Sequence, residues 1–284
     1  MATLKQIRQR IRTAKNIRQI TRAMKLVAAA RLTRAKTRVE QARPYSDKMR
    51  EFIGSIGAAG DMPDNPLLVR RPVKRTVLVV MTGERGLCGS FNSALIRKAG
   101  DFLRETEGEK ALVGVGRKGA QFFAKRGYEI LHRVTVPTAG PELQNAIEVT
   151  EKVKELFISG EADAVHVLYS KFFSPIRQEP TIVQVLPIEP PKGEAKSGKT
   201  YEFEPEPEAL LNLLLPKYLL TIVLQAMLES SASEHGARMT AMTSATDNAG
   251  KMIDSLTLTA NRVRQASITK EILEIVAGAE ALKS

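Results

Sequence analysis

The sequence predicts an α/β domain carried on a long antiparallel coiled coil, which the N-terminal and C-terminal helices of the same chain form together. Three observations support this fold class. Residues 1–43 contain neither proline nor glycine, and residues 217–284 contain no proline. Between these segments, residues 74–190 alternate between apolar runs typical of buried strands and helical patterns.

The N-terminal segment has the apolar spacing of a coiled-coil helix. Pro44 bends this helix without ending it, and Gly57 and Gly60 terminate it, so it spans roughly 80 Å. The seam repeats about every 3.5 residues. It consists of Leu4, Ile7, Ile11, Ala14, Ile17, Ile20, Met24, Ala28, Leu32, Ala35, Val39 and Ala42.

The C-terminal segment predicts a second helix, roughly 100 Å long. Small residues dominate the middle of its seam, from Ala237 to Ala249, and branched aliphatic residues occupy its last turns. Two seams at opposite ends of one chain most simply bury each other as an antiparallel pair, and either helix can project beyond its partner.

The middle of the chain predicts a mostly parallel sheet with helices on its faces. The strands are expected at residues 76–82, 111–115, 129–134 and 164–169, with an edge strand at 181–186. The helices are expected at residues 90–107, 118–126 and 142–159.

Two glycine-rich segments resemble phosphate-binding loops. Gly83, Gly86 and Gly89 follow the first strand, but their spacing is not that of a dinucleotide site, so we interpret them as a structural turn. Residues 193–200 match G-x-x-x-x-G-K-T in full. Because prolines precede this match and no helix can start after it, we interpret it as accidental.

The net charge of +12 lies entirely on the N-terminal segment. Residues 1–39 contain twelve lysines and arginines and no acid, whereas the rest of the chain has 31 of each sign. A solvated helix face, a targeting presequence and nucleic-acid binding are alternatives. A helix that is basic on all sides but for a narrow seam favours enclosure by an acidic protein surface.

Composition indicates neither catalysis nor a cofactor. Cys88 is the only cysteine, and the three histidines share no metal-ligand spacing, so we expect no disulfide and no metal site. No nucleophile is paired with a base. The longest apolar run, residues 210–228, is interrupted by Pro216, Lys217 and Gln225, so we expect no membrane crossing.

Four segments closely resemble the gamma subunit of F-type ATP synthase, in order and over essentially the whole chain. They are residues 2–32, 82–92 (TGERGLCGSFN), 233–249 (SEHGARMTAMTSATDNA) and 261–282. The resemblance implies a terminal coiled coil with a Rossmann-like domain at its base. The domains are then an N-terminal helix (1–60), an α/β domain (74–190), a flexible loop and foot segment (191–207) and a C-terminal helix (208–284).

The function implied by the resemblance is that of a central rotor shaft. Proton flow turns the ring of c subunits and the shaft, and the asymmetric shaft changes the affinities of the catalytic beta subunits in turn. The implied partners are the alpha and beta subunits, the epsilon subunit and the c ring, with no nucleic acid and no cofactor. The implied location is the cytoplasmic face of a bacterial inner membrane, although a mature organellar form would look nearly the same.

The resemblance also implies partner-contact residues. Arg264 and Gln265 match the pair that meets the beta-subunit catch loops, and Met24 and Lys25 match the segment that faces the acidic beta-subunit lever. Arg238 lies next to that region, and Tyr201 and Glu204 match the foot on the c ring. No cysteine pair or regulatory insertion is present, so thiol control is not expected. The alternatives are a nucleic-acid-binding coiled coil and a nucleotide-binding enzyme that uses the loop at Gly193.

Overall fold

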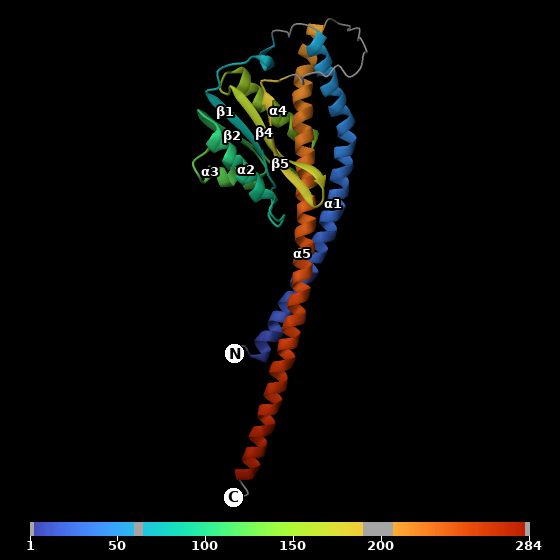
Figure 1. Cartoon of the computed structure of the whole chain (residues 1–284), viewed down its shortest axis with the longest axis vertical. Helices are drawn as coiled ribbons and strands as arrows, with labels where there is room; N and C mark the ends of the chain where they lie inside the picture. The colour runs from blue at the N-terminus through green and yellow to red at the C-terminus, as the bar shows by residue number, and fades with distance from the viewer. Residues whose placement is uncertain (1–2, 60–64, 190–206, 282–284) are drawn as a thin grey trace. The chain divides into compact units, whose positions relative to one another are not determined.

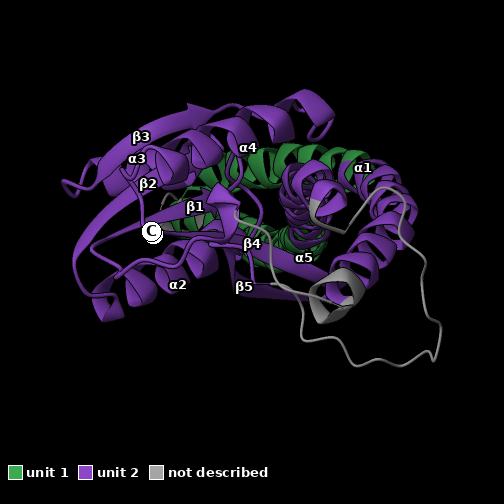
Figure 2. Cartoon of the chain, turned by 90° about the horizontal axis from the view of Figure 1, so that it is seen from above, with its two compact units in different colours: residues 1–27, 239–284 green, residues 28–238 purple. Residues whose placement is uncertain are grey.

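The computed structural model describes residues 3–59, 65–189 and 207–281, and side chains are described within these ranges except at 55–59, 207–208 and 279–281. Contacts divide the chain into two compact units, which Figure 2 colours separately. Unit 1 comprises residues 1–27 and 239–284, and unit 2 comprises residues 28–238. The two long helices, α1 (Leu4–Ala59) and α5 (Pro207–Ala281), contribute to both units.

Unit 2 contains a five-stranded sheet in the order β3-β2-β1-β4-β5 (Figure 1). The strands are β1 (Arg75–Met81), β2 (Glu109–Val115), β3 (Glu129–Val134), β4 (Ala164–Ser174) and β5 (Arg177–Leu186). The first four strands are parallel, and β5 pairs antiparallel with β4. The helices between them are α2 (Phe91–Glu105), α3 (Arg117–Ala124) and α4 (Leu143–Ile158), and the short 3-10 helix η1 (Pro66–Leu68) precedes β1.

The central strand β1 divides the core of unit 2 into two layers. Val77, Val79 and Met81 pack with α4 and α5 on one face, while Leu78 and Val80 pack with α2 and α3 on the other. This alternation follows from the two-residue period of a strand that is buried on both faces. The predicted α/β alternation is therefore confirmed.

The β4–β5 hairpin is longer than the sequence predicts. β4 continues past Tyr169 to Ser174, and β5 begins at Arg177 instead of residue 181. The added residues include Lys171, Gln178 and Glu179, whose polar side chains hide the alternation typical of a strand, yet they pair across the hairpin. Backbone pairing extends both strands where the apolar pattern ends.

The apolar N-terminal third of α5 belongs to the core of unit 2. Its residues Leu211, Leu215, Leu219 and Val223 are buried in the layer that contains α4. By length and composition alone, α5 includes an 18-residue window that could cross a membrane, with a mean hydropathy of 1.6. Packing against the sheet accounts for the apolar character of these residues, because the core helix of a globular domain has the same composition.

Unit 1 is the antiparallel helix pair that the sequence predicts. Thr246 Oγ1 donates to Thr21 Oγ1 at 2.8 Å, and Gly250 lies against the guanidinium of Arg18. Ala249, Ile253 and Ala260 of α5 are buried, as are Ile7, Ala14 and Thr21 of α1. The predicted long coiled coil of terminal helices is confirmed.

The predicted seam is wrong at two positions. Ile17 and Ile20 have exposed fractions of 47% and 59%, whereas the neighbouring Thr21 is buried. A spacing near 3.5 residues identifies an apolar stripe, but the residues that are buried in this part of α1 are Ala14 and Thr21. Two isoleucines assigned to the seam are therefore exposed within unit 1.

We predict that Gly116→Ala destabilises the fold strongly. Gly116 has φ +81, and an added Cβ would lie 1.9 Å from the carbonyl oxygen of Thr82. The expected loss is about 3 kcal/mol or more in the free energy of unfolding. Urea unfolding followed by circular dichroism measures it.

Gly100→Ala is the matched control. Gly100 lies within α2, and a Cβ added there has no neighbour within 4 Å. Alanine should leave stability unchanged or raise it by up to about 1 kcal/mol, because glycine weakens helix interiors. Equal losses in both variants would contradict this account of the β2–α3 turn.

Candidate functional site

The residues predicted to contact partners lie in both units. Met24 and Lys25 are half-buried on α1, and Arg264 and Gln265 are exposed on α5, all in unit 1. Arg238 is half-buried on α5 at the end of unit 2. Tyr201 and Glu204, like the loop at residues 193–200, lie outside the described residues.

The structure does not bring Met24 and Lys25 close to Arg264 and Gln265 within unit 1. Thr21 of α1 lies opposite Thr246 of α5, and the helices are antiparallel, so Met24 faces a part of α5 that precedes Thr246. Arg264 follows Thr246 by 18 residues. At 1.5 Å per residue, roughly 30 Å of helix separates them. They therefore form two separate contact regions.

Unit 1 presents an unneutralised basic surface on α1. Its exposed bases are Lys5, Arg8, Arg10, Arg12, Lys15, Arg18 and Arg22. Within the described part of the chain, none of them forms an ion pair with a carboxylate. Such a surface favours association with an acidic partner.

The end of α5 exposes large apolar side chains. Every residue from Arg264 to Gly278 is exposed, and five of them have large aliphatic side chains: Ile268, Ile272, Leu273, Ile275 and Val276. Ile268, Ile272 and Ile275 have the spacing of one helix face. Exposed apolar patches of this kind mark sites of protein interaction.

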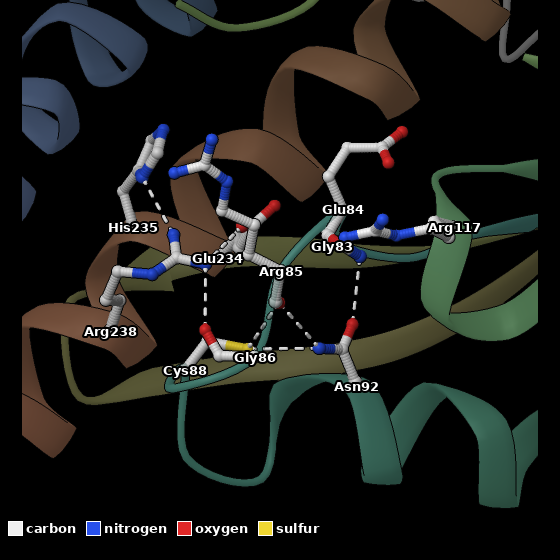
Figure 3. Close-up of polar contacts among 10 residues, drawn as sticks. All are labelled: Gly83, Glu84, Arg85, Gly86, Cys88, Asn92, Arg117, Glu234, His235 and Arg238. Carbon is white, nitrogen blue, oxygen red and sulfur yellow. Dashed lines mark hydrogen bonds and ion pairs between the residues drawn. The ribbon is translucent and has the colours of Figure 1, made fainter. Parts of the chain in front are cut away.

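The glycine-rich loop after β1 is tied together by its own side chains (Figure 3). Asn92 Oδ1 accepts from the backbone N–H of Gly83 at 2.9 Å, and Asn92 Nδ2 donates to the carbonyl of Arg85 at 3.3 Å. The Glu84 carboxylate accepts from the backbone N–H of Val136 at 3.1 Å. These bonds fix the loop and occupy the N–H of Gly83.

A carboxylate from α5 lies against this loop. A Cβ added to Gly83 would be 3.0 Å from the carboxyl carbon of Glu234, so a larger residue would push this carboxylate away from the loop. The negative charge of Glu234 beside Gly83 would repel a phosphate at this loop. The contact supports our interpretation of this loop as a structural turn.

Arg238 links α5 to the loop, and Figure 3 shows its guanidinium between Glu234, His235 and Gly86. One nitrogen donates to Glu234 Oε1 at 2.6 Å and to the carbonyl of Gly86 at 3.4 Å. The other lies 3.3 Å from His235 Nδ1. The Arg238 side chain is only 11% exposed, so solvent screens these charge interactions weakly.

Two further ionisable groups of this cluster are held neutral. Burial, together with the positive charges of Arg238 and Arg31, lowers the pKa of His235 from 6.5 to about 4. Burial, together with the charge of Glu234, raises the pKa of the Cys88 thiol. A neutral imidazole can accept from Arg238, and the protonated thiol is a poor nucleophile.

The sequence analysis missed Glu234 and His235 as partners of Arg238. The signal present in the sequence was the four-residue spacing of Glu234 and Arg238, which places both on one helix face. Their contact with the glycine-rich loop depends on tertiary packing across about 150 residues of chain. Among the described residues, no three histidine, cysteine, aspartate or glutamate side chains could hold a metal ion together.

Comparison with known proteins is consistent with this architecture. The family model described as ATP synthase matches residues 3–282. The ATP synthase gamma chain of Moorella thermoacetica is 47% identical over 283 residues, covering all of both chains. That of Pelotomaculum thermopropionicum is 46% identical over 286 residues, with the same coverage. The chain belongs to the ATP synthase gamma chain family.

Solved structures share the fold of this gamma-chain family member. A chain from the Tetrahymena thermophila mitochondrial ATP synthase central stalk and c ring has a TM-score of 0.61 and 25% identity. The match covers 80% of this chain and 99% of that one. A chain from the Euglena gracilis mitochondrial ATP synthase has a TM-score of 0.72 and 19% identity, covering 98% and 94% of the two chains. The family's combination of terminal helices and α/β domain is thus present here.

We predict that Arg238→Ala destabilises unit 2. It leaves the Glu234 carboxylate, which is 20% exposed, without its cationic partner, whereas the exposed carbonyl of Gly86 can bond to water instead. The expected loss is roughly 2–3 kcal/mol in the free energy of unfolding. Arg264→Ala, an exposed change on the same helix, should cost less than about 0.5 kcal/mol. Comparable losses in the two variants, measured by urea unfolding, would refute the proposed link.

We also predict that His235 makes stability depend on pH. Its pKa is lower in the folded chain, so the unfolded chain binds the proton more readily, and stability falls as pH drops from 6.5 towards about 4. Between pH 7 and pH 5 the contribution is about 2 kcal/mol. Urea unfolding at pH 7 and at pH 5 should show that the free energy of unfolding decreases less for His235→Asn than for the unmodified chain. An unchanged decrease would exclude His235 as its source.

Proposed function

We propose that this chain is the central rotor shaft of a proton-transporting ATP synthase. It transmits rotation of a membrane c ring to a ring of alpha and beta subunits. Membership of the gamma chain family supports the assignment. The observation that carries it is the exposed apolar end of α5, which needs a partner surface to cover Ile268, Ile272 and Ile275.

The two surfaces of unit 1 suit two different contacts in such a ring. The aliphatic end of α5 matches a smooth apolar bearing, within which a helix can turn without breaking specific hydrogen bonds. The unpaired bases of α1 match an acidic surface, where long-range attraction tolerates sliding. In this proposal Met24 and Lys25 meet an acidic lever of the beta subunit, and Arg264 and Gln265 meet its catch loops.

The remaining partner contacts follow from unit 2 and the foot segment. Arg238 is held by Glu234 and Gly86, so we assign it to the support of α5 next to the lever contact. Tyr201 and Glu204 belong to the proposed foot on the c ring, beside the epsilon subunit. In this arrangement, the chain is peripheral to the membrane, on the cytoplasmic face of a bacterial inner membrane.

The chain's own contribution to ATP synthesis is mechanical in this proposal. Nucleotide chemistry takes place in the beta subunits, and the chain itself is not catalytic. The glycine-rich loop supports this view, since Asn92 takes up the N–H of Gly83 and the negative charge of Glu234 lies beside that residue. In this proposal proton flow supplies the torque, and the asymmetry of the helix pair transmits it to the beta subunits.

Co-purification with matched variants tests the proposal. A tagged chain should bring alpha, beta, epsilon and c subunits from detergent-solubilised bacterial membranes. Ile268→Ser/Ile272→Ser/Ile275→Ser should reduce recovery of alpha and beta at least about tenfold, because three buried aliphatic contacts are lost. The isolated variant should unfold at the same urea concentration as the unmodified chain, because these residues are exposed in it.

Lys270→Ser/Glu271→Ser/Glu274→Ser is the control from the same segment, and it should leave recovery within about twofold. All three residues are exposed in the isolated chain. Failure of the unmodified chain to recover alpha and beta subunits would refute the rotor assignment. Equal losses in the two triple variants would refute the apolar bearing.

A further inference from the structure

Unit 2 contains a cavity of about 380 Å³ that the rotor function does not use. It lies between α1, the loop that precedes α4, and α5, and residues from all three line it. This volume is in the range of sites for small molecules, and it is too small for a helix or strand of another protein.

Two arginines of α1, both partly open to solvent as exposed residues, line one wall of the cavity. Arg34 and Arg38 are four residues apart on α1, so their side chains lie on the same helix face. Neither forms an ion pair with a carboxylate of the described residues, and no aspartate or glutamate of the described residues lines the cavity. Arg38 donates only a long bond, 3.4 Å, to the neutral carbonyl of Pro141. The positive charge of this wall is therefore not neutralised.

The opposite wall, which includes Gly140 and Ser231, leaves space next to the side chain of Arg38. A Cβ added to Gly140 would lie 3.5 Å from Arg38 Nη1 and 3.7 Å from the hydroxyl oxygen of Ser231. Glycine at this position keeps the space between the guanidinium and the hydroxyl free of side-chain atoms. Ala35 and Leu228, both mostly buried, supply an apolar part of the lining.

We infer that this cavity binds a small organic phosphate. A phosphate group carries nearly two negative charges and matches two guanidiniums through forked hydrogen bonds. The hydroxyl of Ser231 can donate to a third phosphate oxygen, and the organic part covers Ala35 and Leu228. A single carboxylate would leave one of the two cations unpaired. The site is independent of the rotor assignment.

Calorimetric titration of the full chain with phenyl phosphate and with inorganic phosphate, at constant ionic strength, tests the inference. We expect one saturable site and at least threefold tighter binding of phenyl phosphate, whose ring replaces water at Leu228. Arg34→Gln/Arg38→Gln should weaken phenyl phosphate binding at least about tenfold. Arg10→Gln/Arg12→Gln, which removes the same charge from an exposed part of α1, should change it less than about twofold.

A substitution in the opposite wall checks the location. Ser231→Asp places a carboxylate next to Arg38, which should occupy the cation and abolish phenyl phosphate binding without loss of the native circular dichroism spectrum. Any of four results would overturn the inference. They are no saturable binding, equal weakening in the two double variants, unchanged binding by Ser231→Asp, and equal affinity for the two probes, since an organic phosphate would then have no advantage.

Discussion

The packing of α5 against the sheet is the constraint on which the rest of unit 2 depends. Leu211, Leu215, Leu219 and Val223 fill the same layer as α4, so the first third of α5 is a core element of the α/β domain. Beyond these residues, successive parts of the same continuous helix lie in different surroundings. Its composition changes accordingly, from large aliphatic residues to alanine, serine and threonine, because each part must match a different neighbour.

The last residues of α5 within unit 2 show how that packing is completed by polar contacts. Ser233 donates to the carbonyl of Ser170 at 2.9 Å, and Gly236 allows the backbone of Pro175 to approach. Arg238 adds the bonds to Glu234 and Gly86. Most of these partners are buried or half-buried, whereas Gly86 is exposed. Loss of the buried contacts would leave unsatisfied groups, which makes this end of the unit resistant to local opening.

Periodicity predicted most of this fold because burial imposes it. Strand β1 is buried on both faces and appears as a continuous apolar run, and the terminal helices repeat near 3.5 residues. The β4–β5 hairpin was predicted too short, since Lys171 and Glu179 pair through backbone groups that side-chain patterns do not report. Ile17 and Ile20 were assigned to the seam because spacing does not identify which apolar residues the partner helix covers.

The proposed partner-contact residues and the Arg238 cluster differ in what the sequence can say about them. Met24, Lys25, Arg264 and Gln265 are assigned from motif resemblance alone, and their contacts with other chains stay a prediction. The contact of Glu234 with Gly83 requires a backbone approach between α5 and a loop distant in sequence, which no local pattern encodes. The same holds for Arg34, Arg38 and Gly140, which only the tertiary fold brings together. Local chemistry thus predicts helices and charged faces, whereas sites built from several elements require the structure.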